Sequence, residues 1–581
     1  MAGLRRALVA IAAALALADA SIVALALPPI LVEYDTSISG AAAIVGVYAL
    51  VLALCLWPAR QLRAGPAGLL VFAAASVGCA LAPNLWLMLV FRALQAAGAA
   101  AALLTAYHVL EAGESDHGRR WWLGAALIGT AAGPAIGGAL TEILDWRAIF
   151  AVQVPLALAA AWACRAPAGE AGSAPAAAPG GASPPTTGAS PSATGASPLA
   201  TGASPRAAAA SSPATGASSP TAAASSPAAD TRSLAALALT TAAFTAVLFL
   251  LVIELVAGFA ISPLRAALGV SVLPLAALAA AAIPGERQAR ALAGAVLLAG
   301  GGAALAFLPA PTIAWTLAPQ VLAGAGMGLA LPALSPERNL TQAARTLVAR
   351  HVGIVLVLAI LAPVATAQLN RATDEAILKG ASLVLDAQID PLQKLELAPA
   401  LLDDLNTDAP RQSLTDAVAT RRGEFADNPA VYDRLGQRLD DVVVAAVLEA
   451  FQVAYLIAAA LAIVAALVLI PHVRRPAMAL AAALAAGCAV VYVVEGDAEA
   501  PPAVALADPC NPPAVPGASG LAGALQERVL AQLNQAACRL EVTREELALA
   551  IFDADRAQEF EAEHGVDPRG TIDLLSLLGG G

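Results

Sequence analysis

Two oppositely charged residues, Asp19 and Arg92, lie within long apolar runs of the sequence. A charge at the centre of a bilayer costs about 2.5–3.5 kcal/mol on insertion scales, so it normally faces a partner or a water-filled path. Asp19 lies about 18 Å from the start of its predicted helix, at ~1.5 Å per residue. Arg92 lies about 9 Å into an oppositely running helix, hence about 21 Å from the same side of a ~30 Å hydrocarbon core. Because the two depths are nearly equal, we predict that the two charges can pair.

Such a pair supports two interpretations. A carboxylate that exchanges an arginine partner for a proton is a coupling element, because pairing lowers its pKa and desolvation raises it. Asp19 and Arg92 are therefore candidates for proton coupling or substrate contact. The alternative is a static ion pair that holds two helices together.

Glu254 is the other acidic residue deep in an apolar run. It falls in the outer half of its predicted span, where a long side chain could reach the membrane interface. The alternative is a side chain that faces the interior of a helix bundle and takes part in coupling. Both interpretations stay open from the sequence.

Small residues repeat along one predicted helix. Gly129, Gly133 and Gly137 follow one another at four-residue spacing, and Gly138 is adjacent. Such spacing lets two helix backbones approach closely. Pro134 removes one helical hydrogen bond and permits a bend. We expect this helix to pack tightly against the eighth or the eleventh span, and such a contact could also seal one end of a transport path.

The composition indicates that these helices lie in a membrane. Of the 581 residues, 59% are apolar and 13% are charged, and the mean hydropathy is +0.73. A soluble domain carries about 25% charged residues, so the sequence excludes a soluble enzyme and a disordered protein. With a net charge of −11, a basic surface for nucleic acid is also excluded. Only 4% of residues are aromatic, which favours membrane-spanning helices over a barrel with aromatic girdles.

A transmembrane helix needs roughly 20 apolar residues. The sequence predicts thirteen such spans, near residues 7–29, 40–58, 68–83, 86–109, 123–143, 148–164, 236–259, 266–284, 291–308, 312–334, 351–369, 445–470 and 476–494. The first could instead be a cleaved signal peptide, but its apolar run continues past the small residues that would be cut. Arginines gather in alternate loops, which places the N-terminus in the cytoplasm of a bacterial plasma membrane and the C-terminal tail outside. Arg338, Arg345 and Arg350 are counted among these inner-side charges.

The spans divide the chain into five parts. Residues 1–164 form a first six-helix half, and 233–470 a second one that includes a long outer loop, 370–444, read as short amphipathic helices. Residues 471–494 add one helix, and 495–581 form an outer tail. Between the halves, residues 165–232 contain a Pro-, Gly- and Ser-rich repeat that cannot bury enough apolar surface to fold, so they are predicted to be a disordered cytoplasmic linker.

Two cysteines of the predicted tail, Cys510 and Cys538, are expected to form a disulfide in an oxidising compartment. The histidines are scattered, and no metal-binding spacing or phosphate-binding loop is present. We therefore expect neither a metal nor another cofactor, and no direct use of ATP.

Four motifs in the first half resemble the major facilitator superfamily, in particular its drug:proton antiporter branch with fourteen helices. They are ADASIVALALP at 18–28, RALQAAG at 92–98, GTAAGPAIGG at 129–138 and DWRAIF at 145–150. Of these, the glycine-rich run is similar to the antiporter motif of the fifth helix and is the most specific. The resemblance covers about 400 residues and implies two six-helix halves that rock about a site at the midplane of the membrane.

The resemblance is incomplete in two places. The loop between the second and third helices keeps Arg63 and Gly65, which are gating-loop candidates, but Leu62 occupies the place of the family's Asp. The two central helices of the fourteen-helix branch are also missing, and the linker takes their place.

The resemblance implies a transporter, not an enzyme, that exports small hydrophobic or amphipathic compounds in exchange for protons. Two alternatives remain. One is an exporter of a single endogenous lipid or secondary metabolite; the other is a degenerate facilitator that serves as a membrane platform for its outer loop and tail. The expected partners are membrane lipids, small-molecule cargo and protons, without nucleic acid, and the sequence leaves the oligomeric state open.

Overall fold

The computed structural model describes most of the chain as helices. The described residues are 2–62, 65–165, 227–335, 339–387, 389, 394, 410–425, 429–470, 476–499, 504–512 and 520–571, and these contain no β-strand. The predicted linker lies outside the described residues, apart from its two ends.

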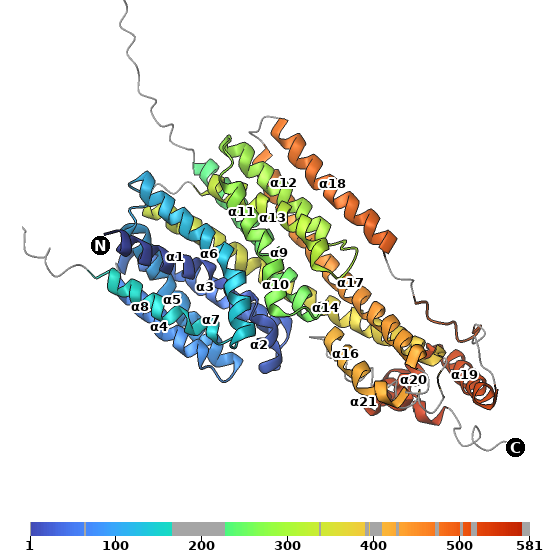
Figure 1. Ribbon diagram of the computed structural model, residues 1–581. Coiled ribbons are helices and arrows are strands. Elements are labelled where there is room, and N and C mark those ends of the chain that lie inside the picture. The colour runs from blue at the N-terminus through green and yellow to red at the C-terminus, as the bar shows by residue number, and fades with distance from the viewer. Residues whose placement is uncertain are drawn as a thin grey trace, which may run out of the picture. The chain divides into compact units, whose positions relative to one another are not determined.

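The first half of the chain forms eight helices (Figure 1): α1 (Ala2–Ala24), α2 (Leu27–Glu33), α3 (Ile38–Leu62), α4 (Pro66–Ala80), α5 (Leu85–Val109), α6 (Asp116–Ile143), α7 (Ala148–Ala151) and α8 (Gln153–Ala163). Two of the long helices begin at polar caps, where the side chains of Asn84 and Ser115 accept hydrogen bonds from Leu87 N and Gly118 N. The helices pack both with sequence neighbours, as α4 does with α5, and with distant ones, as α1 does with α6.

The second half continues the bundle. It consists of α9 (Pro227–Ile253), the π-helix η1 (Glu254–Gly258), α10 (Pro263–Val270), α11 (Val272–Ala281), α12 (Arg287–Leu305), α13 (Ile313–Leu334), α14 (Leu340–Asp386), α17 (Pro429–Leu469) and α18 (Pro476–Glu499). The remaining elements are α16 (Pro410–Arg421), the 3₁₀ turns η2 (Arg422–Phe425) and η4 (Pro568–Gly570), α19 (Gly520–Leu540), α20 (Arg544–Phe552) and α21 (Ala554–His564).

Within the described residues, nine helices are long and apolar enough to cross a membrane. The two parts of α6, Asp116–Gly129 and Ala132–Ile143, meet at 41° and make a tenth if they form one span. The bend lies just before Pro134, whose ring lacks the N–H that would bond the preceding turn. Each of the thirteen predicted spans falls on a helix or on consecutive helices, so the chain is an all-α, multi-pass membrane protein.

Two predicted boundaries are wrong. The linker was expected to run to residue 232, but α9 already begins at Pro227. Proline suits the first turn of a helix, and Asp230 there complements the helix dipole. The loop 370–444 was expected to consist of short helices, but α14 has 47 residues and α17 has 41. At ~1.5 Å per residue both far exceed the ~30 Å of a hydrocarbon core, so both continue beyond the membrane.

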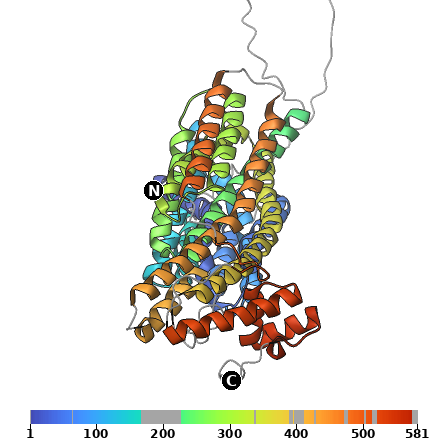
Figure 2. The ribbon, with the colours of Figure 1, turned by 90° about the vertical axis from the view of Figure 1, so that its right-hand side faces the viewer.

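The C-terminal tail folds against one of these extensions (Figure 2). Helices α19 to α21 share a small apolar core that includes Leu530, Leu533 and Phe560. Cys510 and Cys538 form a disulfide. The side chain of Thr543 caps α20 by accepting from Glu546 N at 3.1 Å.

A buried arginine joins the tail to α14. The guanidinium of Arg544, 1% exposed, donates to Asp386 Oδ2 at 2.9 Å and to Ser382 Oγ at 3.2 Å, both on α14. Its Nε also donates to Glu545 Oε1 at 2.7 Å. Because a buried charge is costly without partners, these contacts favour one docked position of the tail.

Candidate transport site

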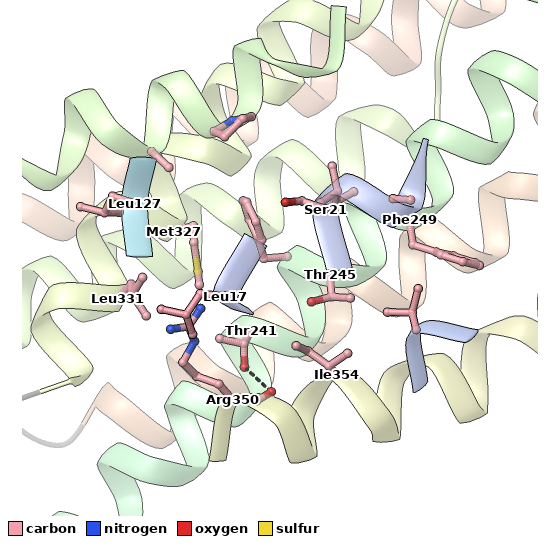
Figure 3. Close-up of a pocket in the computed structure, with 16 residues that line it drawn as sticks. Leu17, Ser21, Leu127, Thr241, Thr245, Phe249, Met327, Leu331, Arg350 and Ile354 are labelled. Atoms are coloured by element: carbon pink, nitrogen blue, oxygen red, sulfur yellow. Dashed lines mark hydrogen bonds between the residues drawn. The ribbon is translucent and has the colours of Figure 1, made fainter. Parts of the chain in front are cut away.

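A cavity lies between the two halves of the bundle and is partly open to solvent (Figure 3). Its empty space of about 840 Å³ includes this open solvent. The first half lines it through α1, α3 and α6, and the second half through α9, α11, α13 and α14. Most lining side chains are apolar: Leu17, Ala24, Val45, Leu127, Phe244, Leu248, Phe249, Pro274, Ala277, Met327, Leu331 and Ile354.

Four lining residues are polar: Ser21, Thr241, Thr245 and Arg350. Ser21 Oγ donates to Ala18 O at 2.7 Å within its own helix. Thr241 Oγ1 similarly donates to Leu237 O at 2.7 Å. Such bonds back to the preceding turn are usual for hydroxyls on membrane helices. The cavity therefore offers a mainly apolar wall with few polar groups.

Asp19 and Arg92 form an ion pair outside this cavity. Arg92 Nη2 donates to Asp19 Oδ2 at 2.6 Å and Nη1 to Asp19 Oδ1 at 3.0 Å, and both side chains are fully buried. This is the two-bond arrangement in which a guanidinium matches a carboxylate best. The pairing joins α1 to α5, as predicted from the positions of the two charges along their helices.

Neutral groups complete the surroundings of the pair. Arg92 Nη1 also donates to Gln95 Oε1 at 2.6 Å, and Arg92 Nε donates to Ile44 O at 3.2 Å. Gln95 Nε2 in turn donates to Ser76 Oγ and to Gln153 Oε1, both at 2.9 Å. This network connects α1, α3, α4, α5 and α8, so it locks the first half together.

Glu254 is buried in the second half. It begins the π-helix that ends α9 and is 1% exposed, so it does not reach the membrane interface. Tyr455 Oη on α17 donates to Glu254 Oε2 at 2.6 Å. In the described part of the chain this hydroxyl is the one hydrogen-bond partner of the carboxyl group, and the group does not line the cavity. π-helical turns within α-helices are frequent at functional sites.

The loop between α14 and α17 contacts the same π-helix. Arg411 on α16 donates to Phe259 O at 3.2 Å, immediately after the last residue of η1. Its guanidinium is held by two bonds to Asp440, at 2.7 and 2.8 Å. The next residue, Ala260, has a φ of +56°, a conformation that costs energy for a residue with a Cβ. Arg411 thus stabilises the end of the helix that carries Glu254.

The glycine run of α6 faces two different helices, so the expected packing is confirmed for one glycine and corrected for three. A Cβ added at Gly129 or at Gly137 would lie 2.5 or 2.4 Å from a backbone oxygen of α1, and at Gly133 2.2 Å from Ser21 Oγ. These three glycines pack on the first span, not on the eighth or eleventh. A Cβ at Gly138 would lie 2.2 Å from Ala267 Cβ on α10, the start of the eighth span. One residue corresponds to a turn of about 100°, so neighbouring glycines serve different partners.

The DWRAIF motif connects two segments at one end of the bundle. Trp146 Nε1 donates to Glu33 Oε2 at 2.5 Å, and Arg147 forms an ion pair with the same carboxylate at the end of α2. The hydrogen bond from Arg147 lowers the pKa of Glu33. The contact is therefore ionic at neutral pH and is lost as the pH falls through that lowered value.

The two gating-loop candidates are only partly described. Gly65 precedes α4 with a φ of +50°, which glycine adopts at little cost. Its carbonyl accepts from Thr105 Oγ1 at 3.4 Å. Arg63 lies outside the described residues.

Comparison with known proteins identifies the family of this chain. The model of the Major Facilitator Superfamily matches residues 9–337, more than half of the chain. The chain belongs to the Major Facilitator Superfamily. Members of this family are transporters, and the cavity of this chain is lined by both halves of its bundle.

Several curated proteins are similar to part of this facilitator. The multidrug resistance protein Stp of Mycobacterium tuberculosis is 33% identical over 150 residues, which are 24% of this chain and 28% of that protein. The tetracenomycin C resistance and export protein of Streptomyces glaucescens is 33% identical over 153 residues, again 24% and 28%. The uncharacterised transporter YvkA of Bacillus subtilis is 35% identical over 156 residues, 24% and 33%. The chain thus spans about a quarter to a third of the length of these relatives.

Two solved structures align with the chain at low sequence identity. A bacterial homologue of the human lysosomal transporter Spinster, inward-facing and unoccupied, is 15% identical with a TM-score of 0.49, over 82% of this chain and 99% of that one. A D-xylose–proton symporter is 12% identical with a TM-score of 0.39, over 60% and 89%.

The cavity contains residues that the sequence alone did not indicate. Arg350 was counted as a charge of an inner loop because it directly precedes an apolar run. The structure instead continues α14 from Leu340 through this position, so Arg350 lines the cavity. Thr241 and Thr245 sit one helical turn apart in a run that hydropathy treats as uniform. A search for polar residues at four-residue spacing within spans could have found these two.

Proposed function

We propose that this facilitator exports small amphipathic compounds in exchange for protons. The observation that carries the proposal is the apolar cavity shared by the two halves. Apolar contacts are non-directional, so such a wall accommodates molecules of varied shape. Relatives named for multidrug resistance and for tetracenomycin C resistance and export are each similar to about a quarter of the chain, which supports the proposal.

Glu254 is the best-placed group to carry the proton. It lies on the helix that presents Thr245 and Phe249 to the cavity, so a change at Glu254 can act on the cavity through α9. Its described partner is a neutral phenol, and no opposite charge is left unpaired when the carboxyl is protonated. A carboxyl in such surroundings can alternate between neutral and ionised forms as access to water changes.

Asp19 and Arg92 act as a brace in this proposal. Protonating Asp19 would leave a fully buried guanidinium without its ionic partner, which is strongly unfavourable. Asp19 lies on α1, two residues before Ser21, which lines the cavity. Asp19 therefore positions α1 at the cavity instead of exchanging protons.

The contact at Gly138 is the proposed seal between the halves. Gly138 packs on Ala267 and Pro263 of α10, and Glu142, one turn further along α6, accepts from Leu264 N at 2.6 Å. Because the backbones of α6 and α10 are so close here, the residues of this contact would meet and separate together when the two halves rock against each other.

The orientation is part of the proposal. We place the N-terminus and the linker in the cytoplasm of a bacterial plasma membrane, and the tail outside. The Cys510–Cys538 disulfide supports the outer position, because such bonds persist in oxidising compartments. A membrane-impermeant maleimide should label these cysteines in intact cells only after reduction. Labelling that requires broken cells would place the tail inside.

Dye transport in inverted vesicles tests the function. Vesicles that contain the protein should accumulate an amphipathic dye when an acid-inside proton gradient is applied, and accumulation should collapse when an uncoupler removes the gradient. Accumulation that survives the uncoupler would refute proton exchange. Absence of transport for all dyes tested, in correctly inserted protein, would favour the membrane-platform alternative.

A further inference from the structure

One short segment of the chain connects Glu254 to the contact proposed as the seal. Glu254 is the first residue of the π-helix η1, and only residues 259–262 separate the end of η1 from the start of α10. Pro263 and Ala267 of α10 then pack on Gly138 of α6. A displacement of η1 therefore reaches the seal through a connection of a few residues.

The connection has an irregular main chain. Phe259 N donates to Glu254 O at 2.8 Å, which closes the wide turn of a π-helix, and Ala260 has a φ of +56°. An α-helical turn would bond the same carbonyl to Gly258 N, one residue earlier. Exchanging one bond for the other moves the chain that follows by ~1.5 Å and ~100° about the helix axis. The segment thus has two local arrangements available, which differ in one hydrogen-bond partner.

The helix α17 holds η1 in its present arrangement. A Cβ added to Gly258 would lie 2.6 Å from Val447 Cγ1, a methyl group on a side chain with little rotamer freedom. About two turns further along α17, Tyr455 Oη donates to Glu254 Oε2 at 2.6 Å. α17 therefore contacts both ends of η1, at Gly258 through packing and at Glu254 through a hydrogen bond.

The charged groups around η1 leave Glu254 as the acid without an ionic partner. Arg411 of α16 is paired with Asp440 of α17 at 2.7 and 2.8 Å. Glu254 is 1% exposed and is bonded to a neutral phenol. Among the described residues that pack on η1, it is thus the buried acid whose charge would stay uncompensated. Further charged side chains on α10, α16 and α17 are exposed, among them Arg265, Asp416, Asp441 and Glu449.

Ionisation of Glu254 disfavours the present packing. A carboxylate that is kept from water with one neutral hydrogen-bond partner is costly, whereas the protonated group carries no charge. Glu254 lies at the end of α9 that leads to the seal, so opening of this end would admit water to the carboxylate. A proton that binds one arrangement more strongly shifts the population toward that arrangement. Protonation therefore favours the closed seal, and loss of the proton favours the open one.

We propose that residues 254–267 form a proton-operated switch: when Glu254 loses its proton, the π-helical turn shifts and the contact at Gly138 opens. Gly258 is the positioning residue of this switch, because its contact with Val447 fixes the turn while the seal is closed. The inference rests on the proposed export function, since it states how the proposed proton carrier acts on the proposed seal. It adds a point of control that lies outside the cavity.

The distance between α6 and α10 beside the seal reports whether the seal is open. Spin labels are attached at Ile143→Cys and Leu268→Cys, two exposed positions on these helices. Distance distributions are measured by pulsed electron paramagnetic resonance from acidic to alkaline pH. In the parent protein we expect the population with the longer distance to grow as the pH rises. The full-length protein is used in lipid nanodiscs, with its free cysteines replaced by alanine: Cys55, Cys79, Cys164 and Cys488.

Glutamate variants identify the group that drives the response. Glu254→Gln should keep the distribution of acidic pH at every pH, because the amide is neutral and does not titrate. Glu449→Gln removes an exposed acid of α17 and should respond like the parent. A pH response that persists in Glu254→Gln would overturn the proposal, and its loss in Glu142→Gln would then assign the response to the exposed carboxylate at the seal.

A pair of substitutions tests the role of Gly258. Gly258→Ala pushes the turn away from Val447, so the ratio of open to closed populations at acidic pH should rise at least about fivefold. Adding Val447→Ala removes the obstructing methyl group and should restore the ratio of the parent. An unchanged ratio in Gly258→Ala, or a double variant as displaced as the single one, would refute the assignment of Gly258. If Gly258→Ala does not fold, Glu254→Gln still decides the proposal.

The distance measurement is independent of transport. A Glu254-dependent change of distance with pH, without proton-driven dye transport, would refute export and leave the switch standing. Proton-driven transport with a distance that responds to pH equally in the parent and in Glu254→Gln would refute the switch and leave export standing.

Discussion

The two buried acids of the bundle, Asp19 in the first half and Glu254 in the second, are held by different kinds of partner. Asp19 receives two hydrogen bonds from Arg92, and two further N–H groups of Arg92 donate to Gln95 and to the main chain of Ile44. Glu254 receives one bond from the hydroxyl of Tyr455 at a π-helical turn. One acid is fixed within a network of five helices, and the other contacts a single side chain of one neighbouring helix.

On this difference we base the proposal that Asp19 has a structural role and that Glu254 exchanges a proton. Neutralising either partner of a buried ion pair leaves the other charge without compensation. Neutralising a carboxyl group that faces a phenol leaves no such charge, and the hydrogen bond can persist with the donor reversed. We therefore propose that the exchangeable proton is carried in the second half, by Glu254, where the helix is also irregular.

The largest expected effect is on proton-driven transport. Glu254→Gln should reduce uphill dye accumulation to the level of empty vesicles, because the amide cannot carry a proton, while downhill exchange of dye continues. Glu449→Gln on α17, an exposed glutamate in another membrane helix, is the matched control and should transport normally. Uphill accumulation at the parent rate in Glu254→Gln would remove Glu254 from the coupling mechanism.

The next effect is on stability. Asp19→Asn should lower the free energy of unfolding by about 3–5 kcal/mol, because Arg92 stays buried without its ionic partner. The measurement is thermal unfolding in detergent. The double variant Asp19→Asn, Arg92→Gln removes both charges and should recover part of the loss. If Asp19→Asn unfolds like the parent but loses its response to the proton gradient, the roles of the two acids are reversed.

A smaller effect concerns movement of one half against the other. Gly138→Ala places a Cβ 2.2 Å from Ala267 Cβ across the contact with α10. Overpacking of this kind costs about 1–3 kcal/mol, enough to shift the balance between two states at least about fivefold. The transport rate should fall accordingly. Gly124→Ala on the same helix, where a Cβ would meet nothing within 4 Å, should not slow transport. Equal rates for both variants would argue against a seal at Gly138.

The smallest expected effect tests whether the loop supports Glu254. Arg411→Gln removes the bond to Phe259 O beside the π-helix, and a typical hydrogen bond contributes about 1 kcal/mol. We expect transport to fall by less than about tenfold, with insertion unchanged. Arg422→Gln breaks an exposed ion pair with Asp433 in the same loop and should have no measurable effect. A loop variant as severe as Glu254→Gln would mean that the loop takes a direct part in transport.

The helices of the bundle could be predicted because each needs enough apolar residues to cross the hydrocarbon, and that requirement is local. The juxtaposition of Asp19 and Arg92 also follows from local counting, since depth in a membrane is proportional to residue number along a helix. The partners around them did not follow. Gln95 lies one turn from Arg92, but Ser76 and Gln153 come from other helices, and no pattern in the sequence relates them.

The glycine run shows that the packing partners of a helix cannot all be predicted from its own sequence. Its spacing indicated a close helix contact, and a close contact is present. The eighth span was predicted as a partner, and Gly138 does pack on its first helix, α10. The contact of Gly137 with α1 was not predicted, because the two neighbouring glycines differ by about 100° around the helix.

The sequence by itself determined a many-helix membrane protein, the positions of its spans, the depth of its charges and its family resemblance, because hydrophobic thickness and helix rise act on one segment at a time. The tertiary structure alone decided what lines the cavity. Arg350 belongs to it because α14 continues unbroken past the predicted loop, and Asp19 and Glu254 are excluded because neighbouring helices supply their partners. Which side chains face a shared space depends on the rotation and packing of several helices together, and no single segment encodes that arrangement.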